Sequence, residues 1–148
     1  MTEAVFWMII SLFDWSHEGD DEAVIEPAIV ALSQKSEEEI LQFEEILAEK
    51  LFALDTLAHA KEIGQEAYVN DDEYFSPDWF LYSRCVVVAN GKELYDEVLK
   101  KPSSFPKDLE FESLLSIGPA AYERKMGKEY NHTTKLSYET YSNKAGWQ

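Results

Sequence analysis

The stretch SEEEILQFEEILAEKLFALDTLAHAKEI, residues 36–63, decides the fold class. Ser36 followed three residues later by Glu39 is a capping box, in which each side chain bonds the other residue's backbone N–H at a helix start. Apolar residues then recur at steps of three and four, which places them on one face of a helix about five turns long. These residues are Ile40, Phe43, Leu47, Leu51, Leu54 and Ala58.

The opposite face of this expected helix is acidic. Glu38, Glu45 and Glu49 fall away from the apolar stripe and form a ridge, which Glu37 and Glu44 widen. We expect these carboxylates to contact a partner of opposite charge. The alternative is an ordinary solvated helix face.

Two shorter helices precede this one. Apolar residues at helical spacing run through 3–15, and a polar break follows. Asp20 or Asp21 can cap a second helix that runs to about Leu32. Pro27 lies inside it and favours a later start, because proline has no N–H to donate.

The stretch SPDWFLYSRCVVVANG, residues 76–91, predicts a central helix. Ser76 with proline at the next position is a typical helix start, and Asn90-Gly91 is a typical helix end. The helix expected over 77–89 is apolar nearly all round, which is typical of a buried helix. A strand over 86–88 is the alternative, because its three valines favour extended structure.

The second half of the chain adds two helices and an irregular end. We expect a short helix over 92–101 and another over 110–126, the latter interrupted near Gly118-Pro119. From residue 130 onward the chain is polar with spaced aromatic residues. The sequence therefore predicts a mainly α, single compact domain of five or six helices over 1–129. Residues 130–148 would form an irregular, aromatic C-terminal arm packed on the body or on a partner.

Arg84 is the unusual residue of the central helix, because eight large apolar side chains surround it in sequence. A buried guanidinium needs a carboxylate or several backbone carbonyls. Asp78 lies six residues earlier, nearly opposite on the same helix, so an acid from another helix or from a second chain is the better partner. The alternative is a cleft in which Arg84 and Asp78 bind a small anionic ligand or substrate.

The charge of the chain is unevenly distributed. Residues 1–75 carry 19 acids and three bases, whereas residues 76–148 carry ten of each, so the first half accounts for the net charge of −16. Such a field repels nucleic acid and anionic membrane surfaces, and it attracts a basic protein. An acidic surface that merely keeps the protein soluble is the alternative.

Signals for catalysis, cofactors and metals are absent from the sequence. No Gly-rich phosphate loop, nucleophile elbow or paired-histidine motif occurs, and His17, His59 and His132 are far apart. The acidic run Asp71, Asp72 and Glu73 lacks the alternation and the glycine of a calcium loop. We therefore expect no cofactor and no metal, and we expect the single Cys85 to be a buried core residue.

The sequence resembles a widespread bacterial domain of unknown function over roughly residues 5–128. Phe6-Trp7 match the opening of that family's pattern. Its central block and C-terminal end match at Asp78, Phe80, Tyr82, Arg84, Gly91, Pro102, Ala121-Tyr122 and Gly127. The chain has Pro77 where the family has the first acid of a pair. The resemblance implies a helical fold and no established chemistry.

Charge, size and the missing motifs together favour an interaction protein over an enzyme. We expect an acidic protein-binding module, most concretely an immunity protein or antitoxin that occludes a basic, nuclease-like toxin. Its contact residues would be the ridge carboxylates with Asp71, Asp72 and Glu73, and a homodimer through residues 1–33 is a further option. Because the first segment has neither a basic start nor the length to span a bilayer, we expect a cytoplasmic protein without membrane contact.

Overall fold

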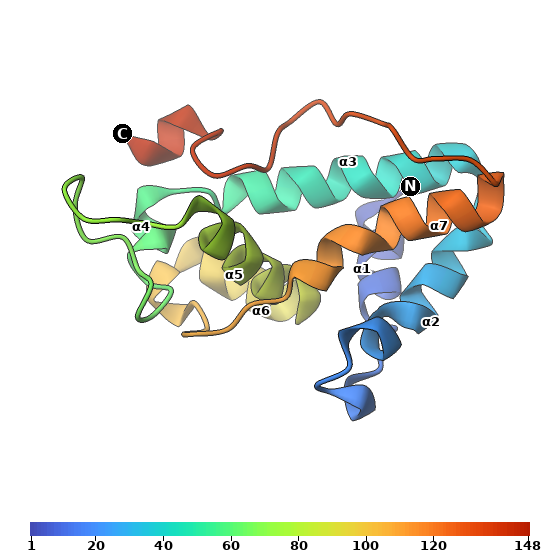
Figure 1. Ribbon diagram of the computed structural model, residues 1–148, viewed down its shortest axis with the longest axis horizontal. Coiled ribbons are helices and arrows are strands. Elements are labelled where there is room, and N and C mark those ends of the chain that lie inside the picture. The colour runs from blue at the N-terminus through green and yellow to red at the C-terminus, as the bar shows by residue number, and fades with distance from the viewer.

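Helix α3, Glu37–Ala53, is the longest helix of the computed structural model, which describes residues 1–148 (Figure 1). Its capping box is present as expected, with Ser36 Oγ accepting from the Glu39 backbone N–H at 3.2 Å. Around it lie α1 (Glu3–Ile10), α2 (Asp21–Ser33), α4 (Leu57–Ala60), α5 (Pro77–Ala89), α6 (Lys92–Lys100) and α7 (Ile117–Met126). Four 3-10 turns complete the regular structure, η1 (Trp15–His17), η2 (Pro102–Ser104), η3 (Glu112–Ser116) and η4 (Lys144–Trp147). The mainly α fold is confirmed.

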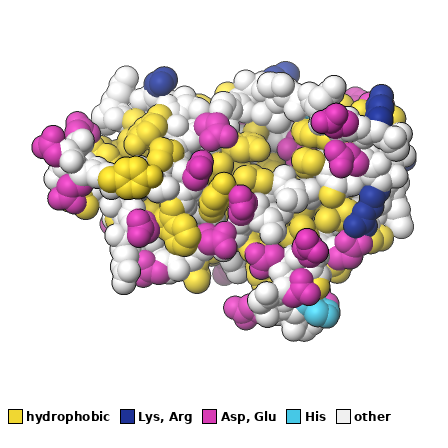
Figure 2. Space-filling view, in the orientation of Figure 1, with side chains coloured by type: hydrophobic (Ala, Val, Ile, Leu, Met, Phe, Trp, Pro, Cys, Tyr) yellow, Lys and Arg dark blue, Asp and Glu magenta, His cyan; other side chains and the backbone are white.

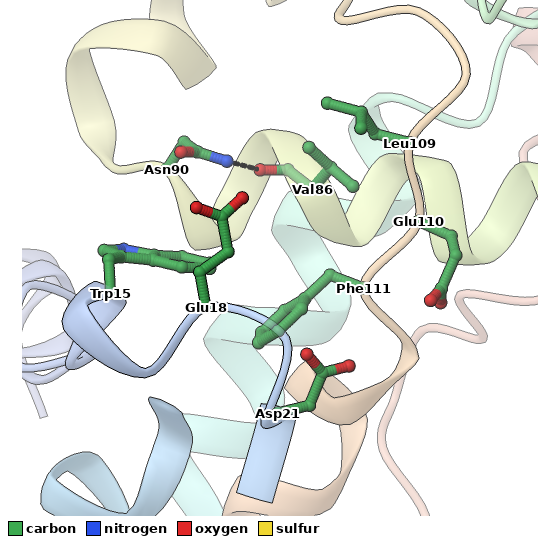
Figure 3. Close-up of a pocket in the computed structure, with 8 residues that line it drawn as sticks. All are labelled: Trp15, Glu18, Asp21, Val86, Asn90, Leu109, Glu110 and Phe111. Atoms are coloured by element: carbon green, nitrogen blue, oxygen red, sulfur yellow. Dashed lines mark hydrogen bonds between the residues drawn. The ribbon is translucent and has the colours of Figure 1, made fainter. Parts of the chain in front are cut away.

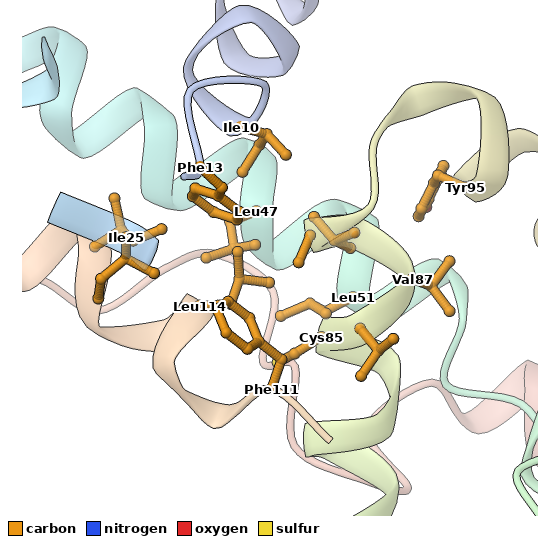
Figure 4. Packing of buried hydrophobic residues seen from close by; sticks show 14 of the residues in the cluster. Ile10, Phe13, Ile25, Leu47, Leu51, Cys85, Val87, Tyr95, Phe111 and Leu114 are labelled. Atoms are coloured by element: carbon orange, nitrogen blue, oxygen red, sulfur yellow. The ribbon is translucent and has the colours of Figure 1, made fainter. Parts of the chain in front are cut away.

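One hydrophobic cluster of 33 buried residues joins these helices into a single domain. Figure 4 shows its centre, where Leu47 and Leu51 of α3 lie near Cys85 of α5 and Leu114 of η3. Most of the predicted stripe on α3 is fully buried, as expected for a helix with one apolar face. None of the helices is long and apolar enough to cross a membrane.

The stripe ends earlier than the sequence predicts, because the helix stops at Ala53. Asp55 leaves the helical path, and Thr56 then caps α4 by accepting the His59 backbone N–H at 3.1 Å. Because α4 is a separate helix, its inward-facing side chains do not continue the repeat of α3. Ala58 is exposed and His59 is buried, so the prediction that Ala58 continues the stripe is wrong.

The first two helices also differ in detail from the prediction. Helix α1 ends at Ile10 rather than near residue 15, and η1 follows it. Helix α2 begins at Asp21, where Asp20 accepts the Ala23 backbone N–H at 3.2 Å. Pro27 lies inside α2 without delaying its start.

Helix α5 is central, as expected, and the alternative of a strand is excluded. Ser76 Oγ accepts the Trp79 backbone N–H at 3.1 Å, and Pro77 is the first helical residue. After Asn90, Gly91 has a φ of 101°, which L side chains rarely adopt, and it is the N-cap residue that precedes α6. The helix expected over 110–126 is η3 followed by α7. The expected interruption is present at Ile117, one residue before Gly118, where η3 gives way to α7. Gly118 and Pro119 lie in the first turn of α7, where a missing N–H costs nothing.

Residues 130–148, which we call the arm, run back along α3 as an extended segment (Figure 1). The arm ends in η4, where the Trp147 ring packs against Tyr141 at a centroid distance of 4.6 Å and against Tyr68 at 5.8 Å. Phe75 and Phe80 contact the same ring at 6.1 Å. The arm therefore lies on the body of the same chain.

Candidate functional site

The acidic ridge predicted on α3 is only partly open to solvent. Glu38 and Glu49 are exposed. Glu37 is half-buried and accepts a hydrogen bond from the Tyr122 hydroxyl at 3.3 Å. Two of the ridge carboxylates are therefore free to meet a partner directly.

Glu45 is occupied by the arm. Its Oε1 lies 3.0 Å from His132 Nε2, and its Oε2 accepts the Lys135 backbone N–H at 3.1 Å. Glu45 is half-buried as a result. These contacts hold the arm against α3. The spacing of acids along α3 could not predict them.

Glu44 does not belong to the exposed ridge, and the prediction that it widens that ridge is wrong. The side chain is 4% exposed and faces Gly118 at the start of α7, where a Cβ would overlap the carboxylate. Burial raises the pKa of Glu44 to about 7, although the facing Tyr130 hydroxyl and Gly118 backbone N–H lower it in part. Glycine at position 118 makes room for this carboxylate.

The acidic run at Asp71, Asp72 and Glu73 forms an exposed tip at one end of the molecule, in the green loop on the left of Figure 1. Tyr74 beside it is 86% exposed, whereas Phe75 is buried. The tip therefore presents three carboxylates and one exposed aromatic side chain, Tyr74, to a partner.

A pocket that the sequence did not indicate opens between η1, the end of α5 and residues 109–111 (Figure 3). Its volume is about 360 Å³. Three carboxylates and no basic residue line it, and the remaining walls are mostly apolar. The lining residues are Trp15, Glu18, Asp21, Val86, Asn90, Leu109, Glu110 and Phe111. We call it the Trp15 pocket.

A cap on η1 and packing against Phe111 position Trp15 in the wall of this pocket. Asp14 caps η1 by accepting the Ser16 backbone N–H at 3.1 Å, and the Trp15 ring packs on Phe111 at a centroid distance of 5.3 Å. The ring nevertheless remains 42% exposed. Figure 3 shows the Glu18 carboxylate on the side of the pocket where Trp15 and Asn90 lie. An aromatic face beside carboxylates can bind a cation that has an apolar stem. The signal for it in the sequence is a tryptophan inside the acidic break between the first two helices.

Arg84 is fully buried and meets no carboxylate within salt-bridge distance. Its Nη1 donates to the carbonyls of Leu51 at 2.8 Å and Tyr138 at 3.0 Å, and its Nη2 donates to Thr140 Oγ1 at 3.0 Å. The guanidinium also lies 4.6 Å from the centre of the Phe80 ring. Burial lowers the pKa of Arg84 to about 10. Of the two expected kinds of partner, the carbonyls are the ones found, and they join α5 to α3 and to the arm.

Asp78 is exposed at the start of α5, so it forms no buried ion pair with Arg84 in this chain. Neither residue lines any of the five cavities of the molecule. The two side chains therefore do not form the cleft that an enzyme or small-ligand binder built on them would need.

Asp55 is a buried side chain that the sequence pattern did not indicate. It is fully buried, and its two oxygens accept the backbone N–H groups of Tyr141 at 3.2 Å and Asn143 at 3.1 Å. Its Oδ1 also accepts the Trp147 indole N–H at 2.8 Å. Asp55 accepts hydrogen bonds from the arm and Arg84 donates hydrogen bonds to it, so the two side chains together fasten the arm.

The other two histidines and Cys85 do not come together in a site. His59 is buried, with Nε2 2.9 Å from the Val98 carbonyl, and burial lowers its pKa. His17 is exposed beside Asp14. Cys85 is fully buried, and burial raises the pKa of its thiol. No group of three or more acidic, histidine or cysteine side chains is placed to hold a metal ion.

Comparison with known proteins identifies a family and no function. Residues 1–124 match the model described as Protein of unknown function (DUF4240), which confirms the resemblance to a domain of unknown function. No curated protein and no solved structure matches the chain. The matched residues end before the arm begins.

Proposed function

The chain belongs to the DUF4240 family, and we propose that it is an acidic protein-binding module whose partner is a basic protein. The most concrete form of this proposal is an immunity protein or antitoxin that occludes a nuclease-like toxin. We further propose a cytoplasmic location, because an inhibitor of a nuclease has to act where the nucleic acid of the cell lies.

The Trp15 pocket is the observation that carries this proposal. Trp15 and Leu109 remain 42% and 53% exposed, although both are large apolar side chains. Beside them lie Glu18, Asp21 and Glu110, and no basic side chain lines the pocket to neutralise these acids. A lysine or arginine of a partner would place its stem on the apolar walls and its charge among the carboxylates.

The charge of the surrounding surface supports the same kind of partner. In the face shown in Figure 2, acidic side chains spread across the middle, whereas basic ones lie along the upper edge and the right end. Only five of the 19 acids in residues 1–75 take part in ion pairs or histidine contacts, namely Glu3, Asp14, Glu26, Glu45 and Glu62. Such an excess speeds the encounter with a basic protein, and salt weakens that effect.

The tip at residues 71–74 and the open ridge residues provide further contacts in this proposal. Tyr74 has the exposure of an interface anchor, since tyrosines contribute disproportionately to binding energy. Asp71, Asp72 and Glu73 would act mainly on the association rate, because exposed charges steer partners more than they hold them. Glu38 and Glu49 would add to the same field.

The test is affinity purification of the tagged chain from its native cells at low and at moderate salt, followed by direct binding measurements. We expect one stoichiometric basic protein that is lost as the salt concentration rises. Trp15→Ala should weaken the binding of the purified partner about 30-fold or more, the loss typical of a buried anchor. Met8→Ala is the matched control, because Met8 is 44% exposed and lies outside the pocket.

A nuclease assay tests the immunity role itself. The purified partner should cleave DNA or RNA alone and lose that activity at a one-to-one ratio with this protein. If a basic partner binds but has no nuclease activity, the binding proposal stands and the immunity role is refuted. If the chain is recovered alone at both salt concentrations, both are refuted.

A further inference from the structure

A second cavity, of about 270 Å³, lies between α3, the start of α7 and residues 130–139 of the arm. Its walls include Glu44, Pro119, Tyr130, Ser137, Tyr138 and Glu139. It is separate from the Trp15 pocket, with which it shares no residue. We call it the Glu44 cavity.

Glu44 is the buried group of this cavity that lacks a sufficient partner. The side chain is 4% exposed, and its Oε1 has no hydrogen-bond partner within the chain. Buried carboxylate oxygens are normally paired, because an unpaired one forfeits its hydration without compensation. Position 118 has to be glycine to leave room for this oxygen, because a Cβ there would overlap it. The fold therefore holds the carboxylate in this position.

The groups around Glu44 do not neutralise it. Glu45 and Glu139 add negative charge nearby, and no lysine or arginine lines the cavity. The Tyr130 hydroxyl and the Gly118 backbone N–H face Glu44, but they offset its burial only in part and leave Oε1 without a partner. His132 also lines it, but its Nε2 is engaged with Glu45 at 3.0 Å. The cavity is therefore a small negative site with hydroxyl and aromatic walls.

From these contacts we propose that the Glu44 cavity binds a primary ammonium group, carried by a free alkylamine or by a lysine side chain. An ammonium brings three N–H donors and a compact charge, which suits one free carboxylate oxygen and nearby hydroxyls. A guanidinium binds a carboxylate best through both of its oxygens in a planar pair, whereas only Oε1 of Glu44 lacks a partner. A metal ion would need a ligand group that the chain does not offer here. The Tyr130 and Tyr138 rings would contact the alkyl stem.

The test is NMR of the full chain with the glutamate side-chain carboxyl carbons labelled, titrated with n-butylammonium chloride. The titration is done at pH 8.5, where Glu44, with a pKa of about 7, is ionised. We expect a saturable shift of the Glu44 carboxyl signal, and a lower pKa of Glu44 when the ammonium is bound. Tetramethylammonium, which has no N–H donor, should cause neither change.

Two variants separate binding at the cavity from general charge effects. Glu44→Gln should weaken binding about tenfold or more, the loss expected for a charge-assisted hydrogen bond. Glu49→Gln on the same helix removes an exposed carboxylate outside the cavity and should leave the affinity unchanged. If Glu44→Gln fails to fold, the comparison of the two ammonium ions on the unmodified chain still decides the question.

The source of the ammonium is tested with Nα-acetyl-lysine-amide in the same titration. Tighter binding than that of butylammonium supports a lysine side chain, and weaker binding supports a free alkylamine. The proposal is overturned if neither probe shifts the Glu44 signal saturably up to tens of millimolar. It is also overturned if tetramethylammonium gives an equal response or if Glu44→Gln binds as well as the unmodified chain.

Discussion

Replacing Glu44 by glutamine should remove a large part of the pH dependence of the stability of this protein. Burial raises the pKa of Glu44 from 4.5 to about 7 in the folded chain. The folded state therefore binds this proton more tightly than the unfolded state does, and stability falls as the pH rises between these values. Below pH 4.5 the carboxyl is protonated in both states and costs nothing.

The size of the effect follows from the shift. Each unit of pKa corresponds to about 1.4 kcal/mol, so the full loss above pH 7 is about 3 kcal/mol. A glutamine of nearly the same shape cannot ionise and avoids this loss. The free energy of unfolding of Glu44→Gln minus that of the unmodified protein should thus grow by about 3 kcal/mol from pH 4.5 to above pH 7.

Urea unfolding at a series of pH values, followed by circular dichroism, measures this difference. Other titrating groups are common to both proteins and cancel in the subtraction. Glu49→Gln is the matched control, because Glu49 is exposed on the same helix and should give a difference that stays flat. Parallel stability curves for Glu44→Gln and the unmodified protein would refute the argument that Glu44 is held in a desolvated site.

Further substitutions test the contacts that fasten the arm and fill the core. Arg84→Met should destabilise the fold by about 3 kcal/mol or more, measured by urea unfolding, because it removes three hydrogen bonds of a buried cation. Asp55→Ala should speed amide hydrogen exchange in residues 141–147 while α5 stays protected, since Asp55 accepts the backbone donors of that part of the arm. Gly118→Ala should lower the melting temperature although alanine favours helices by about 1 kcal/mol, and combining it with Glu44→Ala should restore stability. Cys85 should react with a thiol reagent only as fast as the protein unfolds, because it is fully buried and its thiol pKa is raised.

The family match and the arm together raise a point about other members of the family. The matched region ends at residue 124, yet the buried Arg84 and Asp55 lie inside it and bond residues 138–147 outside it. A chain with these two residues and a different C-terminal segment would need other partners for them. Several hydrogen bonds of both side chains therefore depend on the arm, which lies beyond the family region.

Local chemistry determined the helix starts, and these could be predicted from the sequence. Ser36, Ser76 and Asp20 each accept the backbone N–H of the third residue of the helix that follows. Capping involves neighbours only, and the apolar repeat of a helix is likewise set over a few turns. The central position of α5 followed from the same kind of evidence, since a helix apolar on all sides has to be covered.

Contacts between distant segments decided the rest. Helix α3 ends at Ala53, and Asp55 just beyond it accepts a hydrogen bond from Tyr141 of the arm, 86 residues later in the chain. Glu44 and Glu45 are adjacent in sequence, but α7 and the arm bury the first and bond the second. Helical spacing shows which way a side chain points and does not show what covers it. The sequence alone therefore determined the helices and the acidic charge, whereas the tertiary structure decided which acids remain free to bind.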